Sequence, residues 1–328
     1  MSVGAVDLRQ SEPVARGFST ARPASHIWLG RCARLTSVAT FFLIIAGSLV
    51  TTTDSGLAVP DWPLSFGQFF PPMEGGVLFE HGHRLVAGSV GVLMTALAIW
   101  VLVAERRRWV RMLAVAAWVA VVVQAILGGM TVLMKLPVAV SSAHAGLAMA
   151  FFCATAILAS ALSDKTQMPS VQKITIPRVV LGFGFAAVGI TYIQIILGAV
   201  MRHMGAGLAI PDFPLAWGKL IPPLHATSIA VHFAHRVGAV TVGVVFALLL
   251  WSVYRHQLGD RVLRRRVNLL SVLYGLQFSL GAWTIWSMKS LHVTTTHVAV
   301  GALTLVTAVM VAMRMVQLKT AVRGHRQG

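Results

Sequence analysis

The sequence predicts an all-α integral membrane protein whose eight transmembrane helices form two tandem, pseudo-symmetric four-helix bundles. Two observations lead to this fold class: a composition typical of membrane proteins, and an internal repeat. Hydrophobic residues make up 56% of the 328 residues and charged residues only 11%, with a mean hydropathy of +0.77. Soluble domains carry about 25% charged residues, so the composition indicates a chain that lies largely in lipid.

The repeat can be followed residue by residue. The segment GLAVPDWPL at 56–64 recurs as GLAIPDFPL at 207–215, and each is followed by a histidine-arginine pair, His83-Arg84 or His235-Arg236. Further along, residues 124–144 match residues 277–297. Self-similarity at a fixed spacing indicates a duplicated structural unit, so both copies are expected to form the same set of helices.

Each predicted helix is an apolar stretch long enough to cross a bilayer, which takes about 20 residues. The spans fall near 32–53, 77–104, 112–133 and 141–163 in the first copy, and near 178–201, 227–254, 267–288 and 291–316 in the second. An even number of spans gives both copies the same orientation, which makes this a parallel repeat.

The repeat also sets the expected domain boundaries. In chain order these are a cytoplasmic tail (1–31), an N-terminal four-helix bundle (32–163), a cytoplasmic linker (164–177), a C-terminal four-helix bundle (178–316) and a cytoplasmic tail (317–328).

The net charge of +17 is placed at the ends of the spans. Arginine and lysine cluster before the first span and after every even-numbered one, whereas the loops of the other face hold only Lys135, Arg202, Lys219 and Lys289. This positive-inside pattern predicts a multi-pass protein with both termini in the cytoplasm, and it accounts for the basic charge without nucleic acid as a partner. No apolar secretory signal opens the chain, and its compact length favours a bacterial plasma membrane over a mitochondrial one.

Two long outer connections, residues 54–76 and 202–226, have matching sequences. Each contains Gly-Leu-Ala, a Pro-Asp-aromatic-Pro turn and a Pro-Pro pair, and each leads into a helix that carries a histidine near its start. Their aromatic residues suit the membrane interface. The connections are therefore either interfacial anchors or a pair of lids, and the matched pair favours lids.

Histidines mark the outer ends of alternate helices in both copies. His83 and His235 lie about two turns into the second and sixth spans, and His144 and His297 about one turn into the fourth and eighth. A lone intramembrane histidine is more often a packing residue, but polar residues there usually mark function. Cofactor sites in four-helix bundles lie between facing helices.

The number of histidines per copy restricts the choice of metal. Zinc usually takes three or four protein ligands, whereas haem iron needs only two axial ligands because the porphyrin supplies the other four. Two histidines per copy therefore predict one bis-histidine haem in each bundle.

The two copies differ beside the first histidine. Glu80 precedes His83 by three residues and shares its helix face, whereas the second copy has His232 at this position. An intramembrane carboxylate is costly and points to function. The alternative is an ion pair with Arg84, four residues further on. Because the acid occurs in one copy only, the two haem sites are expected to do different jobs.

An arginine follows the first histidine of each copy. Arg84 and Arg236 lie about 100° around the helix from that histidine. We expect them to bind either haem propionates or the carboxylates of Asp61 and Asp212 in the outer connections.

The set Glu80-x-x-His83-Arg84, His144, His235-Arg236 and His297 resembles the haem A synthase family over residues 32–316. The resemblance implies a membrane enzyme that oxidises the C8 methyl of haem O to a formyl group, giving haem A for cytochrome oxidase. It implies haem b as a cofactor on His235 and His297, and the haem substrate and product on His83 and His144. It also implies a catalytic Glu80 near the reacting methyl.

The same resemblance implies partners, and the chain departs from the family at the cysteines. Besides the lipid bilayer, haem O synthase, cytochrome oxidase assembly and an electron donor are expected, and a homo-oligomer is left open. Many bacterial members carry a cysteine pair in the first outer loop, but Cys32 and Cys153 lie elsewhere.

Further histidines crowd the outer side of the predicted fold. They are His81, His203, His225, His232 and His292. The repeat favours His83 over His81 and His297 over His292 as ligands, because only His83 and His297 have partners at matching positions of the other copy.

Two other functions remain open at this point. A dihaem, cytochrome b-like electron carrier explains the four histidines equally well, but it gives no reason for Glu80 to occur in one copy only. A transporter is suggested by tandem repeats, although transport sites usually show broken helices near the midplane. Here the polar residues cluster at one membrane face.

Overall fold

The computed structural model describes residues 24–163 and 175–324, and within these segments it is all-helical, without strands. Eight helices are long and apolar enough to cross a membrane, which confirms the all-α part of the prediction and the eight spans. They are α1 (Ala24–Thr52), α2 (Gly75–Ala104), α3 (Arg108–Leu133), α4 (Val138–Leu162), α5 (Arg178–His203), α6 (Thr227–Arg255), α7 (Arg261–Trp286) and α8 (Leu291–Gly324), with a short 3-10 helix η2 (Ala206–Leu208) after α5.

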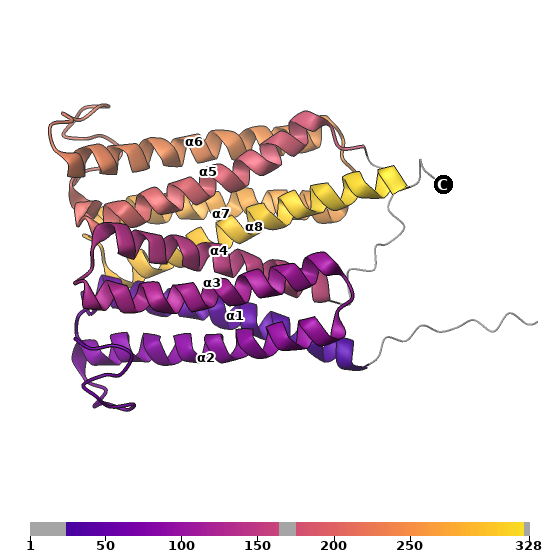
Figure 1. Cartoon of the computed structure of the whole chain (residues 1–328). Helices are drawn as coiled ribbons and strands as arrows, with labels where there is room; N and C mark the ends of the chain where they lie inside the picture. The colour runs from indigo at the N-terminus through magenta and orange to yellow at the C-terminus, as the bar shows by residue number, and fades with distance from the viewer. Residues whose placement is uncertain (1–23, 164–174, 325–328) are drawn as a thin grey trace, which may run out of the picture.

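The helices run roughly along one direction and contact one another in two groups (Figure 1). In the N-terminal half, each of α1 to α4 packs on the next and α4 returns to α1; in the C-terminal half, α5 to α8 repeat this pattern. The halves meet through α4 with α5 and through α1 and α4 with α8. This set of neighbours is compatible with two four-helix bundles, and their division into separate domains stays a prediction.

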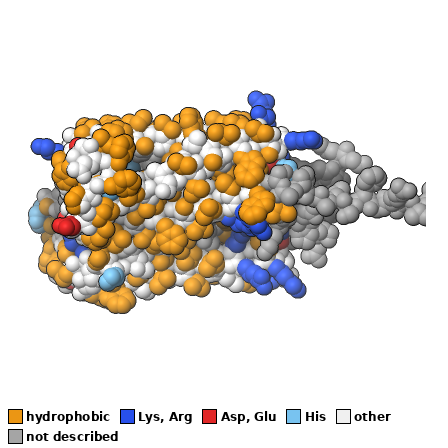
Figure 2. Space-filling model, turned by 90° about the horizontal axis from the view of Figure 1, so that it is seen from below, with side chains coloured by type: hydrophobic (Ala, Val, Ile, Leu, Met, Phe, Trp, Pro, Cys, Tyr) orange, Lys and Arg blue, Asp and Glu red, His pale blue; other side chains and the backbone are white. Residues whose placement is uncertain are grey.

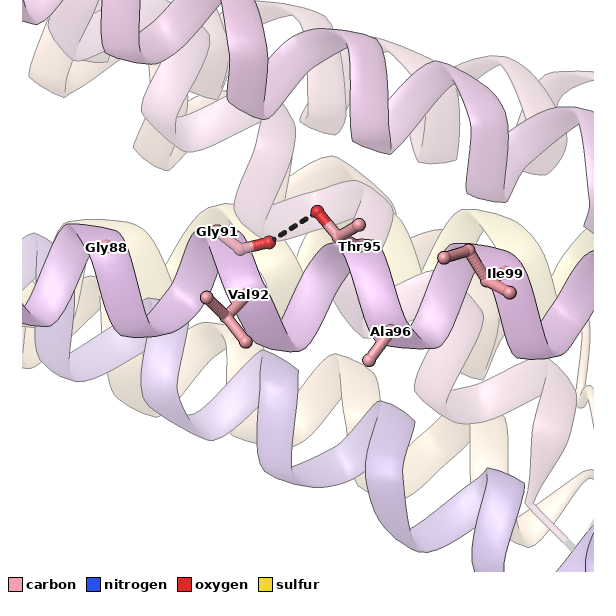
Figure 3. Close-up of a pocket in the computed structure, with 6 residues that line it drawn as sticks. All are labelled: Gly88, Gly91, Val92, Thr95, Ala96 and Ile99. Carbon is pink, nitrogen blue, oxygen red and sulfur yellow. Dashed lines mark hydrogen bonds between the residues drawn. The ribbon is translucent and has the colours of Figure 1, made fainter.

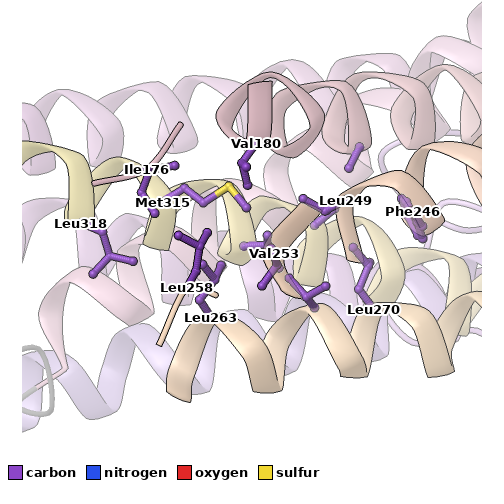
Figure 4. Packing of buried hydrophobic residues seen from close by; sticks show 14 of the residues in the cluster. Ile176, Val180, Phe246, Leu249, Val253, Leu258, Leu263, Leu270, Met315 and Leu318 are labelled. Carbon is purple, nitrogen blue, oxygen red and sulfur yellow. The ribbon is translucent and has the colours of Figure 1, made fainter. Parts of the chain in front are cut away.

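Each half has its own apolar core towards the end opposite the histidines. Phe246, Leu249, Val253 and Met315 belong to the core of the C-terminal half, which α5 to α8 enclose (Figure 4). A second cluster fills the N-terminal half, and a third, with Ile44, Phe152 and Leu305, joins the two halves. Because lipid tails are as apolar as leucine, such cores hold membrane helices together mainly by close van der Waals packing.

The first and last helices are longer than the sequence predicted. Helix α1 begins at Ala24, inside the predicted tail 1–31, and α8 ends at Gly324, inside the predicted tail 317–328. Arg31 and Arg34 explain the first difference, because arginine can lie along a helix and reach the headgroups with its charged end. Of the predicted linker 164–177, only residues 175–177 are described.

The surface has the distribution expected of a membrane protein. Figure 2 shows hydrophobic side chains along the whole visible face, with lysine and arginine side chains gathered mainly at one end. An open groove of about 510 Å³ follows α2 and is lined by Gly88, Gly91, Val92 and Thr95, among others (Figure 3). Val92 lies nine residues from His83, on the opposite side of the helix, so this groove faces away from the histidines.

Candidate functional site

The structure brings the four repeated histidines together in two pairs. His83 on α2 and His144 on α4 are close enough for their charges to interact, and His235 on α6 and His297 on α8 form the equivalent pair. Both pairs lie at the end of the molecule where the two outer loops cross from α1 to α2 and from α5 to α6. The pairing agrees with one site in each half.

The ring nitrogens of these histidines are suited to hold a metal. Nδ1 of His83, His144 and His297 is buried and has no hydrogen-bond partner among the described residues. Leaving a buried polar atom unpaired costs about 1–3 kcal/mol, so each ring has unused bonding capacity. No cluster of three or more histidine, cysteine, aspartate or glutamate side chains occurs in the described segments. Two ligands per site therefore fit haem iron better than zinc.

Glutamines lie beside three of the four histidines. Gln124 donates to the main-chain oxygen of His144 (2.9 Å), and its repeat counterpart Gln277 has Nε2 3.3 Å from Nε2 of His297. Gln194 donates to the main-chain oxygen of His235 (2.8 Å) and lies 3.1 Å from its Nδ1. These amides can orient the helices and rings around a flat ligand.

A glycine faces each histidine from the preceding helix. These contacts pair Gly47 with His83, Gly128 with His144, Gly198 with His235 and Gly281 with His297. These glycines were not predicted from the sequence. The signal was present, because Gly198 and Gly281 repeat Gly47 and Gly128 at the spacing of the two copies.

The two repeated arginines hold the outer loops. In the first outer loop (residues 53–74), Arg84 donates to the main-chain oxygens of Asp61 (2.7 Å), Leu64 (2.8 Å) and Val59 (3.3 Å). From the sequence we expected the Asp61 carboxylate or a haem propionate as the partner. The structure shows main-chain carbonyl groups of the loop, that of Asp61 included, and a propionate contact stays a prediction.

The second outer loop (residues 204–226) is held in the same way. Arg236 donates to the main-chain oxygens of Leu215 (3.0 Å), Ile210 (3.1 Å) and Asp212 (2.6 Å), which are the repeat counterparts of the carbonyls that Arg84 binds. Figure 1 shows both loops at the same end of the molecule, beside the starts of α2 and α6. A half-buried arginine thus closes each loop onto the helix that carries the first histidine.

Glu80 and His232 also play matching structural parts. Glu80 is 4% exposed, and its Oε2 accepts a hydrogen bond from the main-chain N–H of Val59 (2.8 Å). Its Oε1 lies 2.6 Å from Nη2 of Arg84, so the ion pair considered as an alternative is present. In the other half, Nδ1 of His232 accepts from the N–H of Ile210 (3.2 Å). Both side chains therefore tether the same point of their loops, but only Glu80 brings a charge.

Carboxylates inside the loops fix the loop turns. Asp61 accepts from the N–H groups of Gly67 (2.8 Å) and Phe66 (2.7 Å), and these bonds hold the pKa of its exposed carboxyl below 3.8. In the second loop, main-chain N–H groups of Trp217 and Gly218 lower the pKa of Asp212 in the same way. The two turns thus hold an aspartate at the same place, with the shorter hydrogen bonds in the first turn.

Each loop also places an aromatic ring on a helix of its own half. The indole of Trp62 lies so close to Gly129 on α3 that a methyl group there would be 2.7 Å from a ring carbon. The counterpart of Trp62 is Phe213, which packs edge-on against Phe278 and Trp286 of α7 (5.8 and 5.9 Å between ring centroids). The loops therefore cover the outer end of each half.

The remaining histidines divide into buried and exposed ones. His81 is buried and pairs through Nδ1 with the hydroxyl of Ser65 (2.8 Å), while His225 and His292 are exposed. His203, at the end of α5, is close enough to His144 for their charges to interact. Its neighbour Arg202 crosses between the halves.

Arg202 joins the halves at the outer side. It donates from α5 to the main-chain oxygen of Ser48 (2.8 Å) on α1 and to the hydroxyl of Thr52. Ser48 is the residue after Gly47, so this contact lies next to the site of His83. Arg202 has no repeat counterpart of the same charge, because Thr51 occupies the matching position in the first copy.

Comparison with known proteins places the chain among proteins of one family. The COX15-CtaA family, described as a cytochrome oxidase assembly protein, matches residues 30–309. The chain is 32% identical over 259 residues to the heme A synthase of Symbiobacterium thermophilum, covering 77% of this chain and 84% of that protein. It is 31% identical over 229 residues to the heme A synthase of Halalkalibacterium halodurans, covering 68% and 75%. With the heme A synthase of Alkalihalophilus pseudofirmus, it shares 29% identity over 272 residues, covering 80% and 89%.

Proposed function

The chain belongs to the COX15-CtaA family of cytochrome oxidase assembly proteins, and on this premise we propose that it is a haem A synthase. It would oxidise the C8 methyl of haem O to the formyl group of haem A. The relatives named heme A synthase, which match along most of their length, support this activity. The protein is then a multi-pass membrane oxidoreductase in the assembly of cytochrome oxidase.

One observation distinguishes this enzyme from a symmetric haem carrier. The two halves match at both histidines, at the arginine and at the loop aspartate, yet the buried acid Glu80 is replaced by His232. If both halves only carried electrons, nothing would call for a charged group in one of them. The asymmetry supports a reacting site in the N-terminal half and a cofactor site in the C-terminal half.

The proposed division assigns the ligands by half. His235 and His297 would hold haem b within residues 178–316, and His83 and His144 would hold the substrate haem within residues 32–163. A haem b at the first of these pairs would supply one-electron redox chemistry. The paired side chains, the unpartnered nitrogens and the facing glycines support this assignment.

Glu80 is the residue proposed to act on the substrate. It lies one helical turn before His83, and its two oxygens are fixed by Val59 and Arg84. A preorganised carboxylate of this kind stabilises positive charge that develops nearby in a transition state without having to reorient. Arg84 pairs with Glu80 and, by holding the first outer loop, would limit the access of water to the reacting methyl.

The orientation in the membrane follows from the charges. Basic residues gather at the ends of the even-numbered helices, and this supports cytoplasmic termini. Both haem sites would then lie at the outer face. Haem O synthase is the expected supplier of substrate, and cytochrome oxidase is the expected destination of the product. Homologues from bacteria support a bacterial cell membrane.

A dihaem electron carrier is the second candidate, because the equivalent histidine pairs favour two similar haems. Extraction and chromatography of the pigments from detergent-purified protein separate the two functions. Haem b together with haem O or haem A is the expected result. Haem b alone, at about two per chain, would favour the carrier, and the absence of any haem would overturn all four ligand assignments.

A further inference from the structure

We infer that four glycines, Gly47, Gly128, Gly198 and Gly281, are positioning residues that set the orientation of the histidine rings at haem iron. The inference rests on the proposed function, because it concerns the ligands of the proposed haems. It gives these glycines, which have no side chain, the role of orienting the rings. The contacts that support it occur four times, once for each histidine.

In the N-terminal half, the glycines lie on α1 and α3 and the histidines on α2 and α4. A methyl group built on Gly47 would lie 3.0 Å from Cε1 of His83, and one on Gly128 would lie 3.1 Å from Cε1 of His144. Both distances are shorter than ordinary carbon–carbon contacts of about 3.5–4.0 Å. Only glycine leaves room for these rings in their present positions.

The C-terminal half repeats the arrangement with the next four helices. A methyl group on Gly198 of α5 would lie 2.8 Å from Cε1 of His235 on α6. One on Gly281 of α7 would lie 3.3 Å from Cε1 of His297 on α8. The same ring atom faces the glycine in all four pairs, so the contact fixes the same edge of every ring.

This edge determines where the ring nitrogens point. Cε1 lies between Nδ1 and Nε2, and at Gly47 these nitrogens are 3.5 and 3.7 Å from the position of the absent methyl. Metal-bound histidines are usually oriented by a hydrogen bond from the second nitrogen. Nδ1 of His83, His144 and His297 has no such partner among the described residues. At these three histidines, packing against glycine therefore takes over the orienting role. At His235 the glycine acts beside Gln194, whose Nε2 lies 3.1 Å from Nδ1.

The other glycines described in the same helices do not face a histidine ring. A methyl group at Gly189 of α5 or at Gly275 of α7 would meet nothing within 4 Å. Gly129 and Gly184 make equally close contacts, but with Trp62 and Met315, so contact with a histidine ring, and not close packing in itself, sets the four facing positions apart. The chain also supplies a matched control, because Gly189→Ala and Gly198→Ala make the same chemical change in one helix.

The test compares Gly198→Ala with Gly189→Ala in the full-length, haem-loaded protein. For Gly198→Ala we expect a shifted low-spin EPR signal of the oxidised haem. We also expect haem loss to apomyoglobin to be about tenfold faster, because changing an outer-shell partner of a metal site typically costs about 10–100-fold. Gly189→Ala should match the wild type in both measurements. Thermal unfolding of both variants is measured in parallel.

The outcomes separate this inference from the proposed function. A Gly198→Ala protein with lower thermal stability but an unchanged EPR signal and haem-loss rate would make Gly198 a packing residue only and overturn the inference. If Gly198→Ala does not fold, the milder Gly281→Ala is compared with Gly275→Ala by the same criteria. A wild-type protein without haem would overturn the proposed function and this inference together.

Discussion

The first outer loop is attached to α2 by Arg84 and Glu80, and the second is attached to α6 by Arg236 and His232. The arginines bind equivalent carbonyl oxygens, so this part of the attachment is common to both halves. The second tether differs, because a carboxylate accepts the loop N–H in one half and an imidazole accepts it in the other.

This difference shows that a charged side chain is not needed to attach the loop. His232 tethers Ile210 without a charge, so a neutral acceptor is sufficient to hold a loop of this design. A buried carboxylate is more costly than a neutral acceptor, even with Arg84 beside it. The charge of Glu80 therefore requires a reason beyond loop attachment, and the reacting site proposed for the N-terminal half provides one.

The largest expected effect comes from Glu80→Gln. The amide oxygen of glutamine can still accept from Val59, so the loop tether is kept while the charge is removed. Haem A formation should fall by about 10²–10³-fold, the loss seen when one electrostatic stabiliser of a transition state is removed. Haem content should stay close to that of the wild type. Turnover is measured as the ratio of haem A to haem O in extracted pigments.

The matched control is His232→Gln, which keeps a neutral acceptor for Ile210 in the second loop. It should retain haem A formation. Equal losses of turnover in the two variants would mean that Glu80 acts only as a loop tether.

Much of this architecture was open to prediction from the sequence. Apolar length and the internal repeat located all eight spans to within a few residues at most ends. The repeat also assigned His83 and His144 to one copy and His235 and His297 to the other, which predicted the two pairs. The loop contacts of Arg84 could not be predicted, because main-chain carbonyls have no sequence signature. The facing glycines were visible only as a repeat, and their contacts with histidine rings depend on how neighbouring helices pack.

A second prediction compares Arg84→Gln with Arg236→Gln. Each variant loses bonds from a charged donor to loop carbonyls, but Arg84→Gln also leaves the buried Glu80 without its cation. Breaking a buried pair in this way is strongly destabilising. We therefore expect Arg84→Gln to lose about 2 kcal/mol more stability, after allowing for the partial exposure of Arg84. Thermal unfolding in detergent measures the difference.

The double variant Glu80→Gln/Arg84→Gln provides the control. It should recover part of the stability lost in Arg84→Gln, because no unpaired charge remains. Equal stability of Arg84→Gln and Arg236→Gln would contradict the idea that the two attachments differ in charge.

A third, smaller effect is expected where the loops rest on their helices. Gly129 lies under Trp62, and the second half has Ala282 and Phe213 at these positions. In Gly129→Ala the new methyl group should displace the indole and raise the rate of proteolysis in the first loop several-fold. The double variant Gly129→Ala/Trp62→Phe should restore resistance, because it reproduces the pair of the second half. Unchanged proteolysis in the single variant would show that Trp62 does not hold the loop.

The smallest effect concerns pH. Main-chain N–H groups lower the pKa of both Asp61 and Asp212 in the folded protein. The stability that these carboxylates add is therefore fully present above the pKa of the unfolded state. It is lost only as the pH falls through the lower pKa of the folded state. Acidification from pH 7 to pH 5 should thus leave the proteolysis of both loops unchanged. Asp61→Asn keeps only part of the acceptor capacity, and it should loosen the first loop at pH 7 while the second stays as it was. If the first loop instead opened between pH 7 and pH 5, a group with a higher pKa would have to hold it, and the equivalence of the two turns would fail.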